Sequence, residues 1–199
     1  MRKQHLLLAC GLLLLTLSAE AQRFKGGAGI GLLASQVDGD NMEDYHKPGL
    51  FAGVFAALPL QDGKWQLQGE LDYMQKGCKA TNEEGEGMLN TYHATFHQIG
   101  MPLLAQWNCL KTYRLEAGFS FNMTPRISIS RNGEKWDASG EDTYRFFEWG
   151  GVCGLQWQGE GHWGLHLRFL YSLTPVGKSL YSRAGLRHNS LLIHTTYTF

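Results

Sequence analysis

Few residues of this sequence are arranged for chemistry, and the most suggestive group is His188-Asn189-Ser190. A serine nucleophile needs a general base within hydrogen-bond reach and a third group that orients that base. No acidic residue follows Ser190 in the chain. We therefore expect no catalytic residue here, and the histidine–serine pair stays the leading enzymatic alternative.

Two further patterns fall short of a ligand site. His93 and His97 are four residues apart, a spacing that lets two histidines share a metal ion on a helix. On a strand they would lie roughly 13 Å apart at ~3.3 Å per residue, too far for one ion to bridge. Gly27, Gly29 and Gly31 do not complete a dinucleotide fingerprint, and no helical pattern follows them. We expect neither a metal nor a cofactor.

Strands must position these residues, because apolar and polar side chains alternate along most of the chain. "WQLQGELDY", for example, has apolar side chains at Trp65, Leu67, Leu71 and Tyr73 and polar ones between them. Pro102, inside the fourth strand, predicts a bulge nearby. The eight predicted strands cover residues 23–37, 48–60, 65–73, 91–107, 113–122, 147–157, 163–172 and 190–199.

The connections between these strands fall into two classes. Those at 61–64, 108–111 and 159–162 are short, whereas those at 38–47, 81–90, 126–144 and 175–187 are long and polar. Short turns at one end, long loops at the other and an even strand number are typical of outer-membrane barrels. We therefore predict an all-β fold, an eight-stranded antiparallel up-and-down transmembrane β-barrel with both termini in the periplasm.

Aromatic residues on the apolar faces support this placement. In four strands they occur in pairs eight residues apart, which at ~3.3 Å rise and ~40° tilt span about 20 Å along the membrane normal, close to the ~25 Å apolar band. A soluble lipocalin-like barrel, with the apolar face inward, remains the alternative. The pairs are Trp65 and Tyr73, Tyr113 and Phe121, Trp149 and Trp157, and Trp163 and Tyr171.

The N-terminal segment predicts export. Arg2 and Lys3 precede an apolar run, and Ala19-Glu20-Ala21 fits a cleavage site, so residues 1–21 are predicted to be a signal peptide and 22–199 the barrel domain. The charge is balanced, with 18 Lys and Arg against 18 Asp and Glu, which argues against a nucleic-acid partner. The mature chain keeps Cys78, Cys109 and Cys153, an odd number without metal spacing, so we expect packed or lipid-facing thiols.

The polar faces of the strands carry charged side chains that would point into the barrel. An eight-stranded barrel has room only for its own side chains, so these charges should pair with one another rather than perform catalysis. The predicted lumenal charges are Glu70, Asp72, Arg114, Glu116, Glu148, His166 and Arg168.

Four stretches resemble the PorT-like outer-membrane β-barrel proteins: "RFKGGAGIGLLAS", "LQGELDYMQKG", "MPLLAQW" and "LLIHTTYTF". The resemblance implies an outer-membrane location and an accessory role in secretion or envelope assembly. The last stretch, with its terminal Phe199, resembles the signal that the barrel-assembly machinery reads, and it should pair with the first strand.

We thus expect a non-enzymatic, monomeric protein that contacts outer-membrane lipid and binds a protein or glycan through its loops or its periplasmic rim. His188 and Ser190 also resemble the His-x-Ser pair of lipid A deacylases, which makes a lipid-modifying enzyme the alternative. The predicted inward direction of both side chains weakens that alternative, since it turns them away from lipid.

Overall fold

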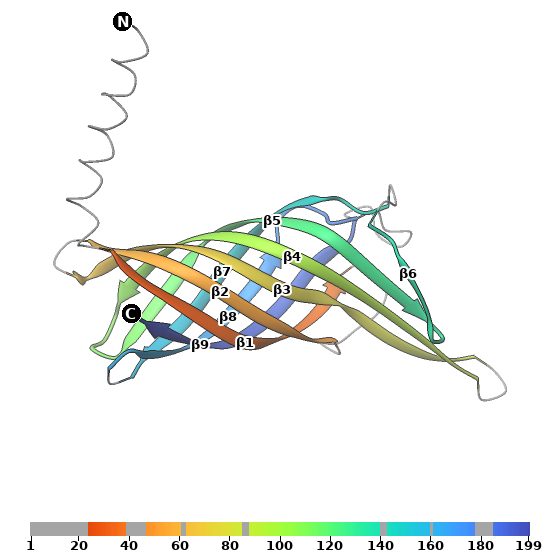
Figure 1. Ribbon diagram of the computed structural model, residues 1–199, viewed down its shortest axis with the longest axis horizontal. Coiled ribbons are helices and arrows are strands. Elements are labelled where there is room, and N and C mark those ends of the chain that lie inside the picture. The colour runs from red at the N-terminus through yellow and green to blue at the C-terminus, as the bar shows by residue number, and fades with distance from the viewer. Residues whose placement is uncertain are drawn as a thin grey trace, which may run out of the picture.

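The computed structural model describes residues 24–38, 47–60, 63–84, 88–139, 143–159, 161–177 and 185–199, so the predicted signal peptide lies outside the described residues. The described residues form a closed antiparallel β-barrel (Figure 1). None of them belongs to a helix that is long and apolar enough to span a bilayer. The strands are β1 (Lys25–Asp38), β2 (Lys47–Leu60), β3 (Trp65–Glu84), β4 (Met88–Asn108), β5 (Tyr113–Arg131), β6 (Glu134–Asp137), β7 (Phe147–Gln158), β8 (Trp163–Ser172) and β9 (Arg187–Thr198).

Eight of these strands form the wall, as predicted, and the last strand closes it against the first. The order is β4-β3-β2-β1-β9-β8-β7-β5, and β4 pairs with β5 to complete the ring. The β1–β9 register runs from Gly27 opposite Thr198 to Asp38 opposite Arg187. The Phe199 amide donates to the Gly26 carbonyl at 2.9 Å. The wall of described strands therefore has no open edge. Its backbone N–H and C=O groups can pair with one another, as they must in lipid, which offers no hydrogen-bonding partners.

The two faces of the wall have opposite chemistry. Large apolar side chains such as Ile30, which is 70% exposed, point outward, and polar side chains such as Gln98 and Glu148 are buried inside. This is the reverse of the lipocalin-like alternative, which needs its apolar face inward. The apolar outer face is the one that lipid covers in an outer-membrane barrel.

The predicted aromatic pairs lie on this outer face and meet across neighbouring strands. Tyr113 is opposite Trp157 and Phe121 is opposite Trp149, so two of the eight-residue pairs lie side by side. On β3, Trp65 stacks on Trp107 with ring centroids 6.2 Å apart. The aromatic residues therefore form bands near both ends of the apolar zone, as the girdle prediction requires.

Two of the predicted long loops are shorter than expected. β3 and β4 remain paired to Glu84 opposite Met88, so most of residues 81–90 is strand rather than loop. Residues 128–131 of β5 pair with the short strand β6 within the predicted loop 126–144. Residues 81–84 are all polar, so the apolar alternation that marks a strand is absent there while the backbone pairing continues. Figure 1 shows these strands projecting beyond the others at one end.

The bulge predicted near Pro102 lies elsewhere. Pro102 stays in register with Ser120, and the register shift falls between His97 and Ile99, where β5 contributes one extra residue at Thr124–Pro125. Pro102 has no amide hydrogen to donate, and the β3–β4 pairing is interrupted around it before resuming in the same register. Beyond the bulge the faces of β5 exchange, so Ile127 becomes buried and Arg126 exposed.

The glycines of β1 face the interior because larger side chains occupy the space opposite. A Cβ at Gly31 would lie 2.3 Å from the His194 Cβ, and one at Gly27 would lie 2.4 Å from the Phe55 ring. These glycines therefore make room for neighbouring side chains.

A charge placed at mid-wall should be costly if lipid covers the outer face. Leu167 lies midway between Trp163 and Tyr171 on the outer face of β8 and is 48% exposed. We expect Leu167→Lys to lower the free energy of unfolding by about 2–4 kcal/mol. Leu110→Lys, in a short turn, should change it by less than about 0.5 kcal/mol. Urea titration of protein folded in lipid vesicles measures both, and equal small effects would contradict a lipid-covered wall.

Candidate functional site

A buried arginine contacts two other wall strands in the half of the barrel nearer the short turns, the end that we expect to face the periplasm. Arg168 on β8 donates from Nη1 and Nη2 to Glu70 on β3, both at 2.7 Å. Its Nε and Nη2 donate to Glu116 on β5 at 2.6 and 3.1 Å. All three side chains are almost fully buried, so the bidentate contacts replace the water that the charges have lost. We call Glu70, Glu116 and Arg168 the periplasmic network.

A second network surrounds one glutamate nearer the long loops, the end that we expect to face the cell exterior. Glu148 on β7 accepts hydrogen bonds from Gln98 at 2.8 Å and Ser172 at 2.9 Å, and its Oε2 lies 2.9 Å from His188 Nδ1. Lys76 Nζ supplies the opposite charge 3.7 Å from Oε1. These partners come from four other strands. We call Lys76, Gln98, Glu148, Ser172 and His188 the extracellular network.

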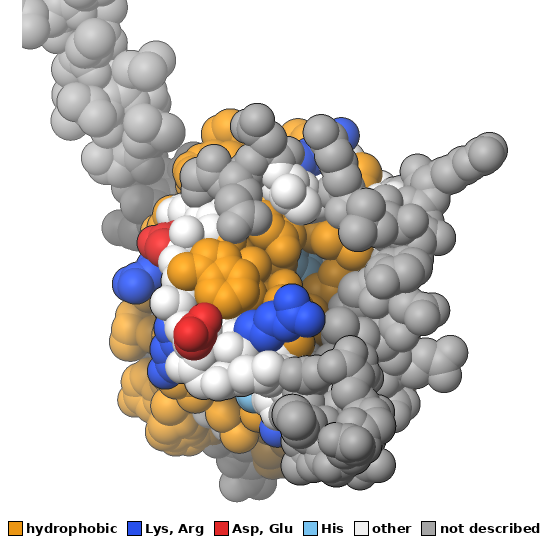
Figure 2. All heavy atoms as spheres, turned by 90° about the vertical axis from the view of Figure 1, so that its right-hand side faces the viewer, with side chains coloured by type: hydrophobic (Ala, Val, Ile, Leu, Met, Phe, Trp, Pro, Cys, Tyr) orange, Lys and Arg blue, Asp and Glu red, His pale blue; other side chains and the backbone are white. Residues whose placement is uncertain are grey.

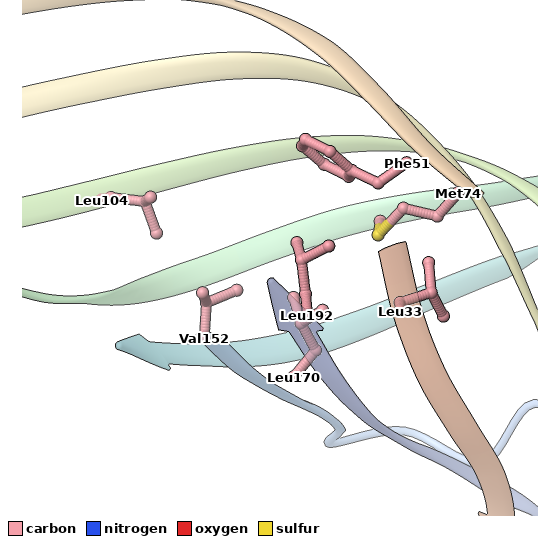
Figure 3. Packing of buried hydrophobic residues seen from close by; sticks show 7 residues of the cluster. All are labelled: Leu33, Phe51, Met74, Leu104, Val152, Leu170 and Leu192. Carbon is pink, nitrogen blue, oxygen red and sulfur yellow. The ribbon is translucent and has the colours of Figure 1, made fainter. Parts of the chain in front are cut away.

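An apolar layer separates the two networks. It takes one buried side chain from each wall strand except β5, and the side chains point into the interior (Figure 3). On β5 the matching position is Gly118, which lies opposite both Leu104 and Val152. Because the layer spans the lumen, we expect it to oppose passage of ions and water. This apolar belt consists of Leu33, Phe51, Met74, Leu104, Val152, Leu170 and Leu192.

A second apolar cluster fills the extracellular mouth. Figure 2 shows hydrophobic side chains gathered at the centre of this end of the barrel. The ring of Phe96 packs edge-on against Tyr144 at 5.4 Å and against His188 at 4.7 Å. The side chains that follow the β5 bulge complete the cluster. This apolar cap consists of Val37, Cys78, Ala94, Phe96, Ile127, Ile129 and Ala138, with Tyr92, Tyr144 and Leu186 packed against it.

The histidine–serine pair faces the lumen, as its strand parity predicted. His188 and Ser190 are buried beneath the apolar cap, whose Phe96 ring packs against His188. Their Nε2 and Oγ atoms have no hydrogen-bond partner within the described residues. The acid that orients His188 is Glu148, which precedes it by forty residues. The sequence pattern does not reveal this partner, because Glu148 lies on β7 and His188 on β9.

The outer wall above the aromatic band carries a row of basic side chains. Lys79 on β3 lies opposite His93 on β4, and His97 lies opposite Arg126 on β5. Tyr73 Oη is 2.7 Å from His97 Nδ1, which places the lower end of the row at the girdle. Arg126 is 66% exposed, and its Nε forms an exposed ion pair with Asp137 Oδ2 at 3.9 Å. We call Lys79, His93, His97 and Arg126 the basic strip.

The charge of the basic strip at neutral pH comes mainly from Lys79 and Arg126. Burial lowers the pKa of His93, and the nearby charges of Lys79 and Lys47 lower it further. His93 and His97 lie on strand β4, as predicted. Within the described ranges no three His, Cys, Asp or Glu side chains gather as a metal site.

All the predicted lumenal charges point into the barrel, and most of them join the two networks. Lys76 was missed, although continuing the parity of β3 beyond Tyr73 would have placed it inside. The cysteines divide between the faces: Cys78 packs in the apolar cap and Cys153 lies on the outer wall. The charged residues of the long connections at 40–44, 83–86 and 178–183 lie outside the side chains that the structure describes.

Comparison with known proteins agrees with this architecture. The family description "Outer membrane protein beta-barrel domain" matches residues 19–177. No curated protein matches the sequence. Among solved structures, Ail of Yersinia pestis in complex with the heparin analogue sucrose octasulfate aligns with a TM-score of 0.53 and 12% identity, covering 89% of this chain and 99% of Ail. Neisserial surface protein A aligns with a TM-score of 0.51 and 14% identity, covering 88% and 97%. At these identities the likeness concerns the fold alone.

The periplasmic network should be essential for stability. Arg168→Met leaves two buried carboxylates without a cation and should destabilise the barrel by about 3–5 kcal/mol. Adding Glu70→Gln and Glu116→Gln should restore much of that loss, because the uncompensated charges are gone. Urea unfolding, followed by the gel shift between folded and boiled protein, gives the free energy of unfolding of the wild type, of Arg168→Met and of the triple variant. If the triple variant is no more stable than Arg168→Met, then unpaired buried charge is not the cause of the lost stability.

Proposed function

We propose that this chain, which belongs to the outer membrane protein beta-barrel domain family, is a non-enzymatic protein that binds an anionic glycan at the cell surface. The observation that carries the proposal is the basic strip, which lies on paired strands that continue beyond the aromatic girdle. β3 runs eleven residues past Tyr73, roughly 36 Å along the strand at ~3.3 Å per residue.

The arrangement of the strip favours a negatively charged ligand. Side chains directly opposite on paired strands lie close together, so placing Lys79 against His93 and His97 against Arg126 gathers basic groups that repel one another once the histidines are protonated. An anionic ligand would relieve that repulsion and would gain charge-assisted hydrogen bonds. A row of cations along strands suits an elongated chain of sulfates or phosphates better than a compact protein surface.

The lumen offers less support for a pore or an enzyme. The apolar belt and the apolar cap lie across the barrel interior at two levels. The pair His188 and Ser190 lies between these layers, out of reach of a lipid acyl chain on the outer wall. These observations favour a protein that acts at its ends over a channel or a lipid A deacylase.

The PorT-like resemblance adds two proposals about context. The protein would serve as an accessory to secretion or envelope assembly, and the barrel-assembly machinery would recognise β9 with its terminal Phe199. The pairing of β9 with β1 supports the proposal about the assembly machinery, because β9 is the strand that closes the wall. We expect the folded protein to act as a monomer in lipid.

Sucrose octasulfate, which the Ail complex contains, is a suitable polyanionic probe. We expect it to bind the purified protein in detergent micelles, more weakly as salt is added. Lys79→Gln with Arg126→Gln should weaken binding about tenfold, at ~0.7 kcal/mol for each exposed charge. Titration calorimetry at low salt measures the affinities.

The matched control removes two charges from the opposite end of the barrel. Lys64→Gln with Lys111→Gln alters the short turns, so it changes net charge equally and should leave binding unchanged. Equal losses in the two double variants would mean that only net charge matters. Unchanged binding after loss of Lys79 and Arg126 would contradict a site on the basic strip.

A further inference from the structure

The periplasmic end of the lumen contains a polar cavity that the surface role does not use. Its volume is about 340 Å³, within the range of small-molecule sites. The periplasmic network lies beneath it, and the apolar belt lies farther in. The side chains that matter most for recognition are Gln66, Gln68, Arg114, Gln156, His166 and Thr196.

The glutamines on one side of the cavity are held by the network below. Gln66 donates to Gln106 at 2.8 Å, and Gln106 donates in turn to Glu116 at 3.1 Å. Gln68 donates to Glu70 at 2.5 Å. Gln66 also donates to Gln68 at 3.3 Å, so both of its amide hydrogens are used, whereas Gln68 keeps one amide hydrogen available to a ligand. The cavity wall is therefore pre-organised for hydrogen bonding.

One acceptor in this wall has no partner. Gln156 is 5% exposed and donates to Gln158 at 3.1 Å, but its Oε1 atom is buried and accepts no hydrogen bond from the described residues. A buried amide oxygen without a donor costs about 1–3 kcal/mol. A hydroxyl or amide N–H of a bound molecule would satisfy it.

The charge in the cavity is positive. Arg114 donates from Nε to Asn108 at 2.6 Å and has no ion pair among the described residues. Lys25 also lines the cavity, and none of the described lining residues is Asp or Glu. A guanidinium recognises a carboxylate through two parallel hydrogen bonds. The cavity thus presents a site for a carboxylate near an acceptor for a hydroxyl or amide group.

We propose that this cavity binds a small sugar acid from the periplasm, with its carboxylate on Arg114 and a hydroxyl or amide N–H on Gln156. The ring of Phe55 lines the same cavity and offers an apolar surface to the sugar ring. The site is independent of the basic strip, because it lies at the opposite end of the barrel.

Two related sugars test the proposal on the full mature chain in detergent micelles. N-acetylmuramate carries a carboxylate, and N-acetylglucosamine has the same acetamido ring without it. We expect N-acetylmuramate to bind at least about tenfold more tightly, the effect of one charge-assisted contact. Arg114→Gln should abolish this difference, and Arg114→Lys should restore part of it. Gln156→Leu should weaken both sugars. Saturation-transfer NMR and calorimetry measure binding.

Lys111→Gln is the control, since it removes a charge at the same end but outside the cavity. The gel shift on boiling confirms that each variant has folded. The proposal is overturned if neither sugar binds the wild-type protein, because the cavity then holds only water. It is also overturned if both sugars bind equally, or if Arg114→Gln keeps the preference for N-acetylmuramate.

Discussion

A membrane-spanning sheet cannot keep an open edge, and the rest of this structure depends on that constraint. Lipid offers no hydrogen bonds, so β9 must pair with β1 along its length. Closure with eight strands makes the lumen narrow, and side chains from opposite walls meet inside it. Charges such as Arg168 and Glu116 must then pair with one another, and apolar side chains can span the interior. The molecule is left with its two ends as places for recognition.

The bulge in β5 connects the barrel wall to the surface that we propose binds a glycan. One extra residue at Thr124–Pro125 exchanges the faces of the strand. Ile127 and Ile129 therefore turn inward and help to build the apolar cap, whereas Arg126 turns outward and joins the basic strip. Without the bulge, the arginine would point into the apolar mouth and the isoleucines would face water. A single inserted residue thus sets the chemistry of both faces.

The sequence predicted the membrane-spanning part well because lipid enforces a strict alternation. The strand from Trp163 to Ser172 ends where it was expected to, and the lumenal charges lie on the predicted face. The predicted strand ends and bulge are wrong beyond the membrane, where lipid no longer imposes this alternation. The pairing of β3 with β4 continues to Glu84 without an apolar pattern, and the bulge lies beside Pro125 of β5, not beside Pro102 of β4. The His188–Glu148 contact joins residues far apart in sequence, so only the strand order could reveal it.

The central claim is that the lumen is sealed and that the protein acts at its ends. Single-channel recording in planar bilayers tests it most directly, with protein whose folding has been verified by the gel shift. The apolar belt predicts no steady unitary current at any voltage that the bilayer tolerates. Reproducible current steps from wild-type protein would contradict the account, because ions would then have to cross the layer between the two networks.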